Sequence, residues 1–262
     1  MGLVLPLNIF RLTLQYKGTQ YLGFQVQSIG QTIQGELNRA LRVISKSEEV
    51  KSIGSGRTDA GVHAHGQIVR IEIPLEIATD SLVRAINSHL PYDIRVIDAS
   101  CCTTDFHPIY SAHSKEYNYV FSNKKSISPF AHDLITLFPF DLDFELMKKG
   151  CQVFCGEHDF VNFQCTGTDV DSTVRKIFSC ELVHHHSNGH WGHVIDEYYV
   201  LRIIGNGFLK QMVRLMMGAI WNLGRGKITL ENLKESLKGG VPLKRLGATA
   251  PPEGLYLIEV HY

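Results

Sequence analysis

One loop of the sequence presents a carboxylate in a setting suited to catalysis. Residues 54–67 read GSGRTDAGVHAHGQ, in which four glycines surround Asp59, Arg57 and two histidines. Glycine reaches positive φ and lets another backbone or a ligand approach closely. Residues 50–53 and 68–73 predict a strand on each side of the loop. A carboxylate held between two strands is fixed in place, and it can act there as a nucleophile or as a base.

Two other interpretations of this loop compete with that one. Asp59 could bond its own backbone, as aspartate often does in a turn. His63 and His65 share a strand face, so together with Asp59 they could hold a metal ion and make the chain a metal-dependent hydrolase.

A second group of histidines lies beside Ser187-Asn188-Gly189, a strong hairpin signal. Consecutive strand residues point to opposite faces, so three in a row cannot converge on one metal without help. We therefore expect this group on the hairpin surface: His184, His185, His186, His190 and His193.

Composition sets the class of protein. A chain of 262 residues with 44% hydrophobic residues suits one large domain or two modest ones. No apolar run reaches membrane-spanning length and no signal peptide is evident, so we expect no membrane association and a cytoplasmic location. The six cysteines form no CxxC clusters, which favours reduced thiols.

Charge is balanced overall but not along the chain. The 26 basic and 26 acidic residues argue against indiscriminate binding of polyanions. Residues 208–250, however, hold eight basic and only two acidic residues. Such a segment is a candidate surface for phosphate contacts.

Hydrophobic periodicity predicts two halves, with a boundary near residues 103–108 where the pattern breaks. The first half reads as strand, helix, strand, strand, helix and strand, which describes a split βαβ unit. The second half repeats this logic, with predicted helices over residues 144–154 and from Phe208 onward. Its predicted strands are residues 111–121, 174–184 and 191–204, and Tyr117, Tyr119 and Phe121 alternate along the first of these.

The run at residues 56–64, followed by Gly66-Gln67, resembles the catalytic loop of tRNA pseudouridine synthases of the bacterial A type. Four further stretches resemble that family in the same order: residues 16–27, where Phe24 stands in place of the more usual Trp, residues 105–119, residues 208–214 and residues 250–257. The resemblance implies the pseudouridine synthase fold, an α+β fold. Two split-βαβ-like halves, 1–105 with the Asp loop and 106–262 with the Tyr strand and the Arg helix, share a mixed, largely antiparallel central sheet flanked by helices, with the active-site cleft between them.

The resemblance also implies an activity. Members of this family isomerise uridines at positions 38, 39 and 40 of the tRNA anticodon stem-loop to pseudouridine, with no cofactor or metal, and they work as homodimers. Asp59 would be the essential nucleophile or base, Arg214 its partner, Arg57 the residue that fills the space left by the extruded base, and Tyr117 the ring against that base. Candidate RNA contacts are Lys210, Gln67 and His63.

Some features leave room for other functions. Lys115-Glu116 departs from the basic residues that relatives usually carry there, which puts a phosphate contact at this position in question. The chain could instead be a pseudouridine synthase of the same superfamily that acts on a different RNA site. A non-catalytic RNA-binding protein could share the scaffold, although an intact Asp59, Tyr117 and Arg214 argue against it.

Overall fold

The structure is a computed structural model that describes residues 7–165, 170–240 and 245–262. The chain forms two compact units. One unit runs up to His113 and also takes in Leu257–Tyr262, and the other is Ser114–Tyr256. The division into residues 1–105 and 106–262 stays a prediction about domain organisation.

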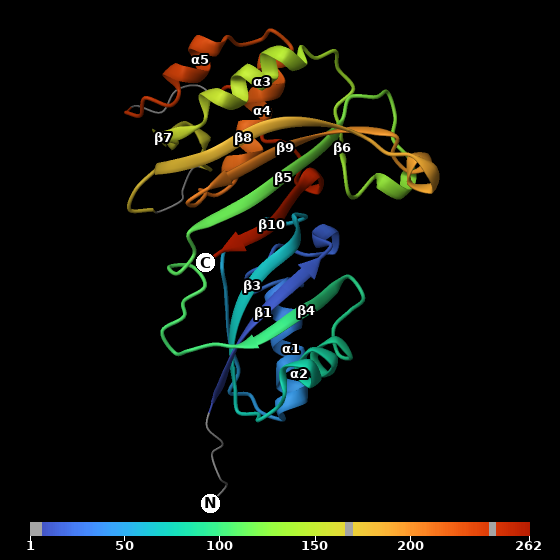
Figure 1. Cartoon of the computed structure of the whole chain (residues 1–262), viewed down its shortest axis with the longest axis vertical. Helices are drawn as coiled ribbons and strands as arrows, with labels where there is room; N and C mark the ends of the chain where they lie inside the picture. Colours follow the sequence, from blue (N-terminus) through green and yellow to red (C-terminus); the bar gives the residue numbers. More distant parts are fainter. Residues whose placement is uncertain (1–6, 166–169, 241–244) are drawn as a thin grey trace, which may run out of the picture. The chain divides into compact units, whose positions relative to one another are not determined.

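The first unit is built on antiparallel strands. Their order is β4-β1-β3-β10, and β2 pairs with β3 (Figure 1). The pairings of β1 with β3, β1 with β4 and β2 with β3 are antiparallel. The elements are β1 (Asn8–Tyr16), α1 (Ile33–Ser45), β2 (Lys51–Gly54), β3 (His63–Ile73), α2 (Thr79–Asn87), β4 (Ile94–Cys101) and β10 (Leu255–His261).

Apolar periodicity accounts for the core of this unit. Every second residue of β1 is buried, so one face of the strand packs inward. Helix α1 begins at its N-cap Thr32, whose hydroxyl accepts the backbone N–H of Gly35 at 3.1 Å. The buried stripe of α1 has helical spacing: Ile33, Leu37, Ala40 and Leu41.

The second unit has strand order β5-β9-β8-β7. The pairs β5–β9, β8–β9 and β7–β8 are antiparallel, and β6 pairs with β5 in parallel. Helices α3, α4 and α5 gather on one side of β8 and β9 (Figure 1). The elements are β5 (Ser114–Ser122), β6 (Thr136–Leu137), α3 (Phe144–Val153), β7 (Gly156–Asp159), β8 (Val174–His186), β9 (Glu197–Gly205), α4 (Met212–Gly224) and α5 (Leu230–Glu235).

The observed elements confirm the α+β class, with ten strands, mostly antiparallel, and five α-helices among the described residues. Several predicted bounds are wrong, and three starts differ most. Strand β3 begins at His63 and not at residue 68, so it already includes both histidines of the loop sequence. Strand β9 begins at Glu197 and not at residue 191, because Gly189–His193 forms a 3-10 helix. Helix α4 begins at Met212 and not at Phe208, because Gln211 lies in the left-handed region with φ 63°.

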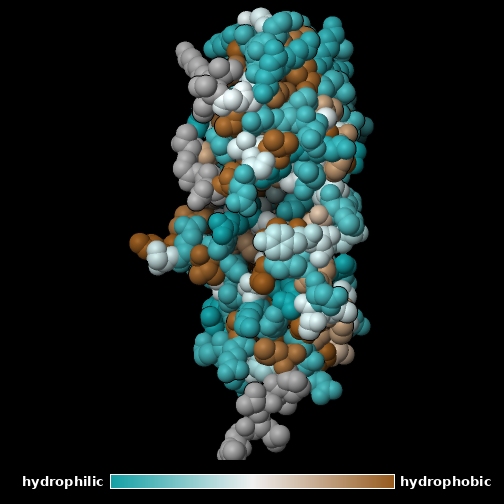
Figure 2. Space-filling model, turned by 90° about the vertical axis from the view of Figure 1, so that its left-hand side faces the viewer, coloured by the Kyte–Doolittle hydropathy of each residue, from teal (hydrophilic) through white to brown (hydrophobic). Residues whose placement is uncertain are grey.

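The surface carries no continuous apolar belt on the face seen in Figure 2, where hydrophilic side chains predominate and hydrophobic ones form small separate groups. Among the described residues, every helix is too short or too polar to cross a membrane.

Candidate active site

The Asp59 loop connects β2 to β3, and its backbone is tied down on both sides of the carboxylate. The carbonyl of Thr58 accepts the N–H of Phe24 at 3.1 Å, and the N–H of Gly61 donates to Tyr21 O at 3.3 Å. Within the loop, the N–H of Val62 donates to Asp59 O at 3.1 Å. Asp59 itself is half-buried. The loop therefore holds a partly accessible carboxylate on a fixed backbone.

Buried side chains add a second layer of support. Gln67, which is 0% exposed, is central to this layer. Its Oε1 accepts from Ser55 Oγ at 2.6 Å, and its Nε2 donates to the carbonyl of Gly56 at 2.7 Å. The hydroxyls of Tyr16 and Thr58 bond at 2.9 Å on the other flank. The bonds Ser55–Gln67 and Tyr16–Thr58 are shielded from water, so losing either is costly.

Two glycines let the neighbouring segment approach this loop. A Cβ on Gly18 would lie 1.9 Å from the carbonyl oxygen of Val62, which no side chain tolerates. Gly23 has φ +101°, and a Cβ there would lie 2.6 Å from Thr58 O. The glycines of residues 18–23 therefore allow the backbone contact that fixes the catalytic loop.

The residues predicted around Asp59 differ in how far their side chains are exposed to solvent. Arg57 is exposed, two residues from the carboxylate. His63 is 1% exposed, and its Nδ1 accepts the N–H of Gly18 at 3.0 Å. Gln67 and His63 are both buried and bond to the loop or its neighbouring segment, and their contact with RNA stays a prediction.

The predicted metal interpretation of the loop gains no support. His65 is exposed, and its Nδ1 lies 2.8 Å from Gln15 Nε2. Among the described residues, only one group of at least three His, Cys, Asp or Glu side chains brings its potential ligand atoms within 4.8 Å of one another. That group is His184, His186 and Glu197, far from this loop in the sequence.

Tyr117 lies on β5 in the second unit, opposite Ile203 of β9. It is 8% exposed, and its ring meets Phe208 edge to face, with the centroids 5.0 Å apart. Edge-to-face contact of this kind favours one ring orientation. Tyr119 and Phe121 are 0% exposed, so all three members of the predicted aromatic row are buried, with Tyr117 the least deeply buried.

The unusual Lys115-Glu116 pair precedes Tyr117. Arg202 donates to both oxygens of Glu116, at 2.7 and 3.0 Å, and the two carboxylates Glu116 and Glu181 raise the pKa of Arg202. Burial lowers the pKa of Lys115. The negative charge of Glu116 is thus neutralised within the sheet and is not presented as a bare charge beside Tyr117.

Arg214 lies in the first turn of α4. Its Nε donates to the carbonyl of Ala250 at 2.7 Å, and the N–H of Ala250 returns a bond to Arg214 O at 3.1 Å. The first bond restrains the guanidinium, and the second holds Ala250 against the helix backbone. Lys210 precedes the helix, which begins at Met212, and it is exposed.

The structure places the predicted residues in two groups. Asp59, Arg57, His63 and Gln67 belong to the first unit, whereas Tyr117, Lys210 and Arg214 belong to the second. The pairing of Asp59 with Arg214 therefore stays a prediction. The sequence did not single out the residues that support the loop, namely Tyr16, Gly18, Ser55 and Thr58, because each is an ordinary strand or turn residue until its partner is known.

Comparison with known proteins gives one consistent result. The family model described as tRNA pseudouridine synthase matches residues 13–111 and 151–262. Proteins named tRNA pseudouridine synthase A are similar over almost their whole length. One from Exiguobacterium sibiricum is 39% identical over 97% of this chain and 96% of its own. One from Geobacillus sp. (strain WCH70) is 36% identical over 96% of this chain and 97% of its own. One from Listeria welshimeri is 34% identical over 97% of this chain and 98% of its own. With the Asp59 loop and its supports intact inside the matched region, the chain belongs to the tRNA pseudouridine synthase family.

Proposed function

We propose that this protein isomerises uridines in tRNA to pseudouridine, and that its targets are positions 38, 39 and 40 of the anticodon stem-loop. One observation carries the chemical part of the proposal. Asp59 stands half-buried on a loop whose backbone and side chains are bonded on both sides of it. Such preorganisation is what a nucleophile or base needs when it must meet one atom of a large substrate.

The reaction moves a base without adding or removing atoms. The N1–C1′ bond of uridine breaks, the uracil rotates, and C5 bonds to C1′ while its hydrogen leaves as a proton. An ionised Asp59 beside the ribose would attack C1′ or remove a ribose proton. Arg214, whose guanidinium is restrained by Ala250, would keep this carboxylate charged and oriented. No redox step occurs, so the proposed reaction calls for no redox cofactor.

The target base must leave its stack before it can react. Extrusion costs a few kcal/mol, and stacking on an aromatic ring returns roughly 1–3 kcal/mol. Tyr117, held edge-on by Phe208, is the ring we assign to this role. The exposed Arg57 would occupy the vacated space in the stem.

Binding of tRNA would depend on phosphate contacts and RNA shape more than on base edges. The exposed cations Lys210, Lys227 and Lys234 belong to the basic segment that supports this. The family resemblance supports a homodimer that holds one tRNA across both subunits. A tRNA substrate supports a cytoplasmic location.

The proposal is tested by tritium release from tRNA labelled at C5 of uridine. Wild-type protein should release tritium in the presence of a chelator. Asp59→Asn should reduce release by at least about 10⁴-fold, since it removes the only proposed nucleophile or base. Asp98→Asn, which changes an exposed aspartate of β4, is the matched control and should keep wild-type activity. Full activity of a folded Asp59→Asn variant would rule out the proposed role of Asp59.

The anticodon target is tested separately. Replacing the uridines at positions 38, 39 and 40 with cytidine should abolish release from that tRNA. Release that persists from the substituted tRNA, and still depends on Asp59, would assign the enzyme to a different RNA site. Tight binding of every tRNA without release would instead favour a binding protein.

A further inference from the structure

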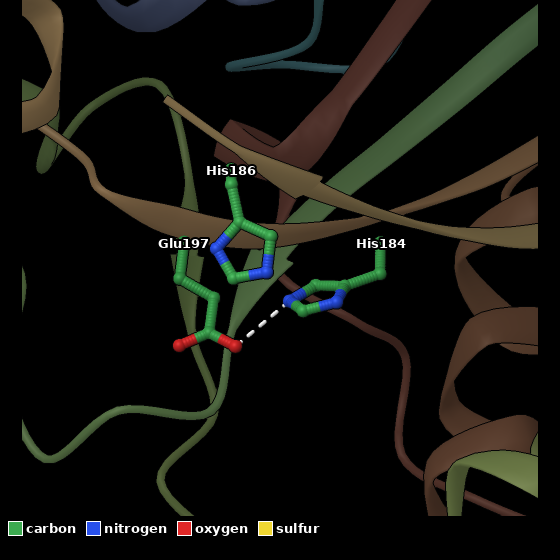
Figure 3. Close-up of side chains that lie close together, drawn as sticks. All are labelled: His184, His186 and Glu197. Atoms are coloured by element: carbon green, nitrogen blue, oxygen red, sulfur yellow. Dashed lines mark hydrogen bonds and ion pairs between the residues drawn. The ribbon is translucent and has the colours of Figure 1, made fainter. Parts of the chain in front are cut away.

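The ends of β8 and β9 bring three metal-binding side chains together. His184, His186 and Glu197 each offer one ligand atom, and these atoms all lie within 4.8 Å of one another. Figure 3 shows the two imidazole rings and the carboxylate turned toward the same space. Two histidines with one carboxylate form a donor set that suits zinc and related divalent transition metals.

Strand register explains why these three residues meet. His184 and His186 are two residues apart on β8, so they share a face, and His186 lies directly opposite Glu197 of β9. The intervening His185 points to the other face, where its ring stacks on Tyr198 with the centroids 5.1 Å apart. The prediction is correct that three consecutive histidines cannot all face one metal ion. His185 points away, and Glu197 from the neighbouring strand provides the third potential ligand.

The geometry of His184 is set by its surroundings. Its Nε2 lies 2.7 Å from Glu197 Oε1, the bond drawn dashed in Figure 3. Its ring stacks on Tyr199 at 4.5 Å and 11°, and Tyr199 in turn stacks on Phe144 at 4.0 Å. A ligand ring held in this way loses little freedom when a metal binds.

One neighbouring cation opposes metal binding. Lys124 Nζ lies 3.7 Å from Glu197 Oε2 and also forms a shorter ion pair with Asp196. Because Asp196 can retain the lysine, Glu197 can turn to a metal without leaving Lys124 unpaired. Glu197 also borders an open cavity of about 340 Å³, so water can reach the remaining coordination positions.

We propose that His184, His186 and Glu197 bind one divalent transition-metal ion of the zinc class, with water completing a tetrahedral site. Such a site has bonds of about 2.0–2.2 Å and therefore ligand atoms roughly 3.3–3.5 Å apart, which side-chain rotation of the observed group can reach. The metal joins the ends of β8 and β9 beside the Gly189–His193 turn. Glu197 is six residues along β9 from Ile203, the partner of Tyr117, so the metal lies about 20 Å from that residue and is structural, not catalytic.

The test is titration of reduced, tag-free protein with Zn²⁺ by calorimetry, and with Co²⁺ by absorption spectroscopy. One ion per chain is expected. His186→Gln and Glu197→Gln should each weaken it by at least about tenfold, because each removes one of three protein ligands. His185→Gln is the matched control on the same strand and should change the affinity by less than about twofold, since its ring faces away.

Two outcomes would overturn the proposal. One is equal affinity in the wild type and all three variants. The other is a Co²⁺ charge-transfer band, which arises from thiolate ligands and would place the ion on cysteines. Hydrogen exchange gives a second measurement, because amides at the ends of β8 and β9 should exchange more slowly with Zn²⁺ in the wild type but not in His186→Gln. These measurements read metal binding alone, so their result is independent of the isomerase proposal.

Discussion

At the scale of single residues, the position of Asp59 depends on side chains that never meet the substrate. Gln67 ties the start of the loop to β3, because one amide bonds both Ser55 and the carbonyl of Gly56. Its side chain is fully buried, so water cannot readily replace its bond to Ser55.

Gln67→Leu should therefore lower the free energy of unfolding by about 1–3 kcal/mol, since the Ser55 hydroxyl and the carbonyl of Gly56 each lose one hydrogen bond worth about 0.5–1.5 kcal/mol. Isomerisation should fall with it, because the Asp59 loop loses its anchor. Urea denaturation and single-turnover kinetics measure the two effects. Gln15→Leu, the same change at an exposed residue of β1, should stay within about 0.5 kcal/mol of wild type. Equal effects of the two substitutions would contradict this account.

The sequence identifies the chemistry of the site better than its support. The resemblance of residues 56–67 and 105–119 to the synthase family singles out Asp59 and Tyr117, whereas the glycine-rich run alone also fits a turn and the aromatic row alone also fits a core strand. Gln67 and His63 looked like ligand-facing polar residues, since nothing local distinguishes a buried glutamine from an exposed one. Their burial follows from partners at Ser55 and Gly18, and distance along the chain conceals those partners.

At the scale of elements, α4 is the part of the second unit that positions Arg214. Eleven of its thirteen residues are buried, so it packs on nearly all sides. A Cβ on Gly218 would lie 1.9 Å from Ala248 O, and one on Gly247 would lie 2.3 Å from Gly218 O. This backbone contact leads directly to Ala250, the residue that holds the guanidinium of Arg214.

Gly218→Ala should push residues 246–250 away from α4, although alanine favours a helix by about 1 kcal/mol. We expect a loss of about 1–3 kcal/mol in the free energy of unfolding and reduced isomerisation as Arg214 loses its support. Gly150→Ala in α3 is the comparison, because its new Cβ would meet only the ends of the Leu223 and Ile220 side chains, which can shift. A larger loss from Gly150→Ala, measured by urea denaturation, would argue against a backbone clash at Gly218.

Element bounds were predictable where an apolar stripe ends in an ordinary cap, as in α1 after Thr32. The bounds were harder to predict where the backbone conformation ends an element before its apolar pattern ends. Phe208 and Leu209 continue the apolar pattern of α4, yet Gln211 adopts a left-handed conformation that stops the helix short of them. Trp191 likewise precedes an apolar strand but belongs to a 3-10 helix.

At the scale of the whole molecule, buried tyrosines predict a loss of stability at alkaline pH. Burial raises the pKa of Tyr21, whose hydroxyl donates to Asp93 at 2.7 Å, and burial also raises the pKa of Tyr119. In the unfolded chain tyrosine ionises near a pKa of about 10. Above that pH the unfolded state binds fewer protons than the folded state, so the free energy of unfolding falls as pH rises.

The stabilisation from Tyr119 should be complete below pH of about 10 and be lost as the pH rises toward its raised folded value, with a slope of about 1.4 kcal/mol per pH unit. Urea denaturation between pH 8 and about 11.5 measures this slope. Tyr119→Phe should make the curve shallower by that amount above pH of about 10. Tyr110→Phe, at a residue 84% exposed, should leave the curve unchanged. An identical curve for Tyr119→Phe and wild type would remove Tyr119 as the cause.

The membership of Leu257–Tyr262 in the first unit constrains the order in which that unit can be completed. These residues supply most of β10, the neighbour of β3, and the ribosome makes them after the entire second unit. While the chain is still being synthesised, β2 covers only residues 69–72 on that side of β3, so the rest of this edge could pair with another nascent chain. The strand that leads out of the Asp59 loop is therefore the place where a stalled chain would be open to misassembly, and the arrival of β10 closes it.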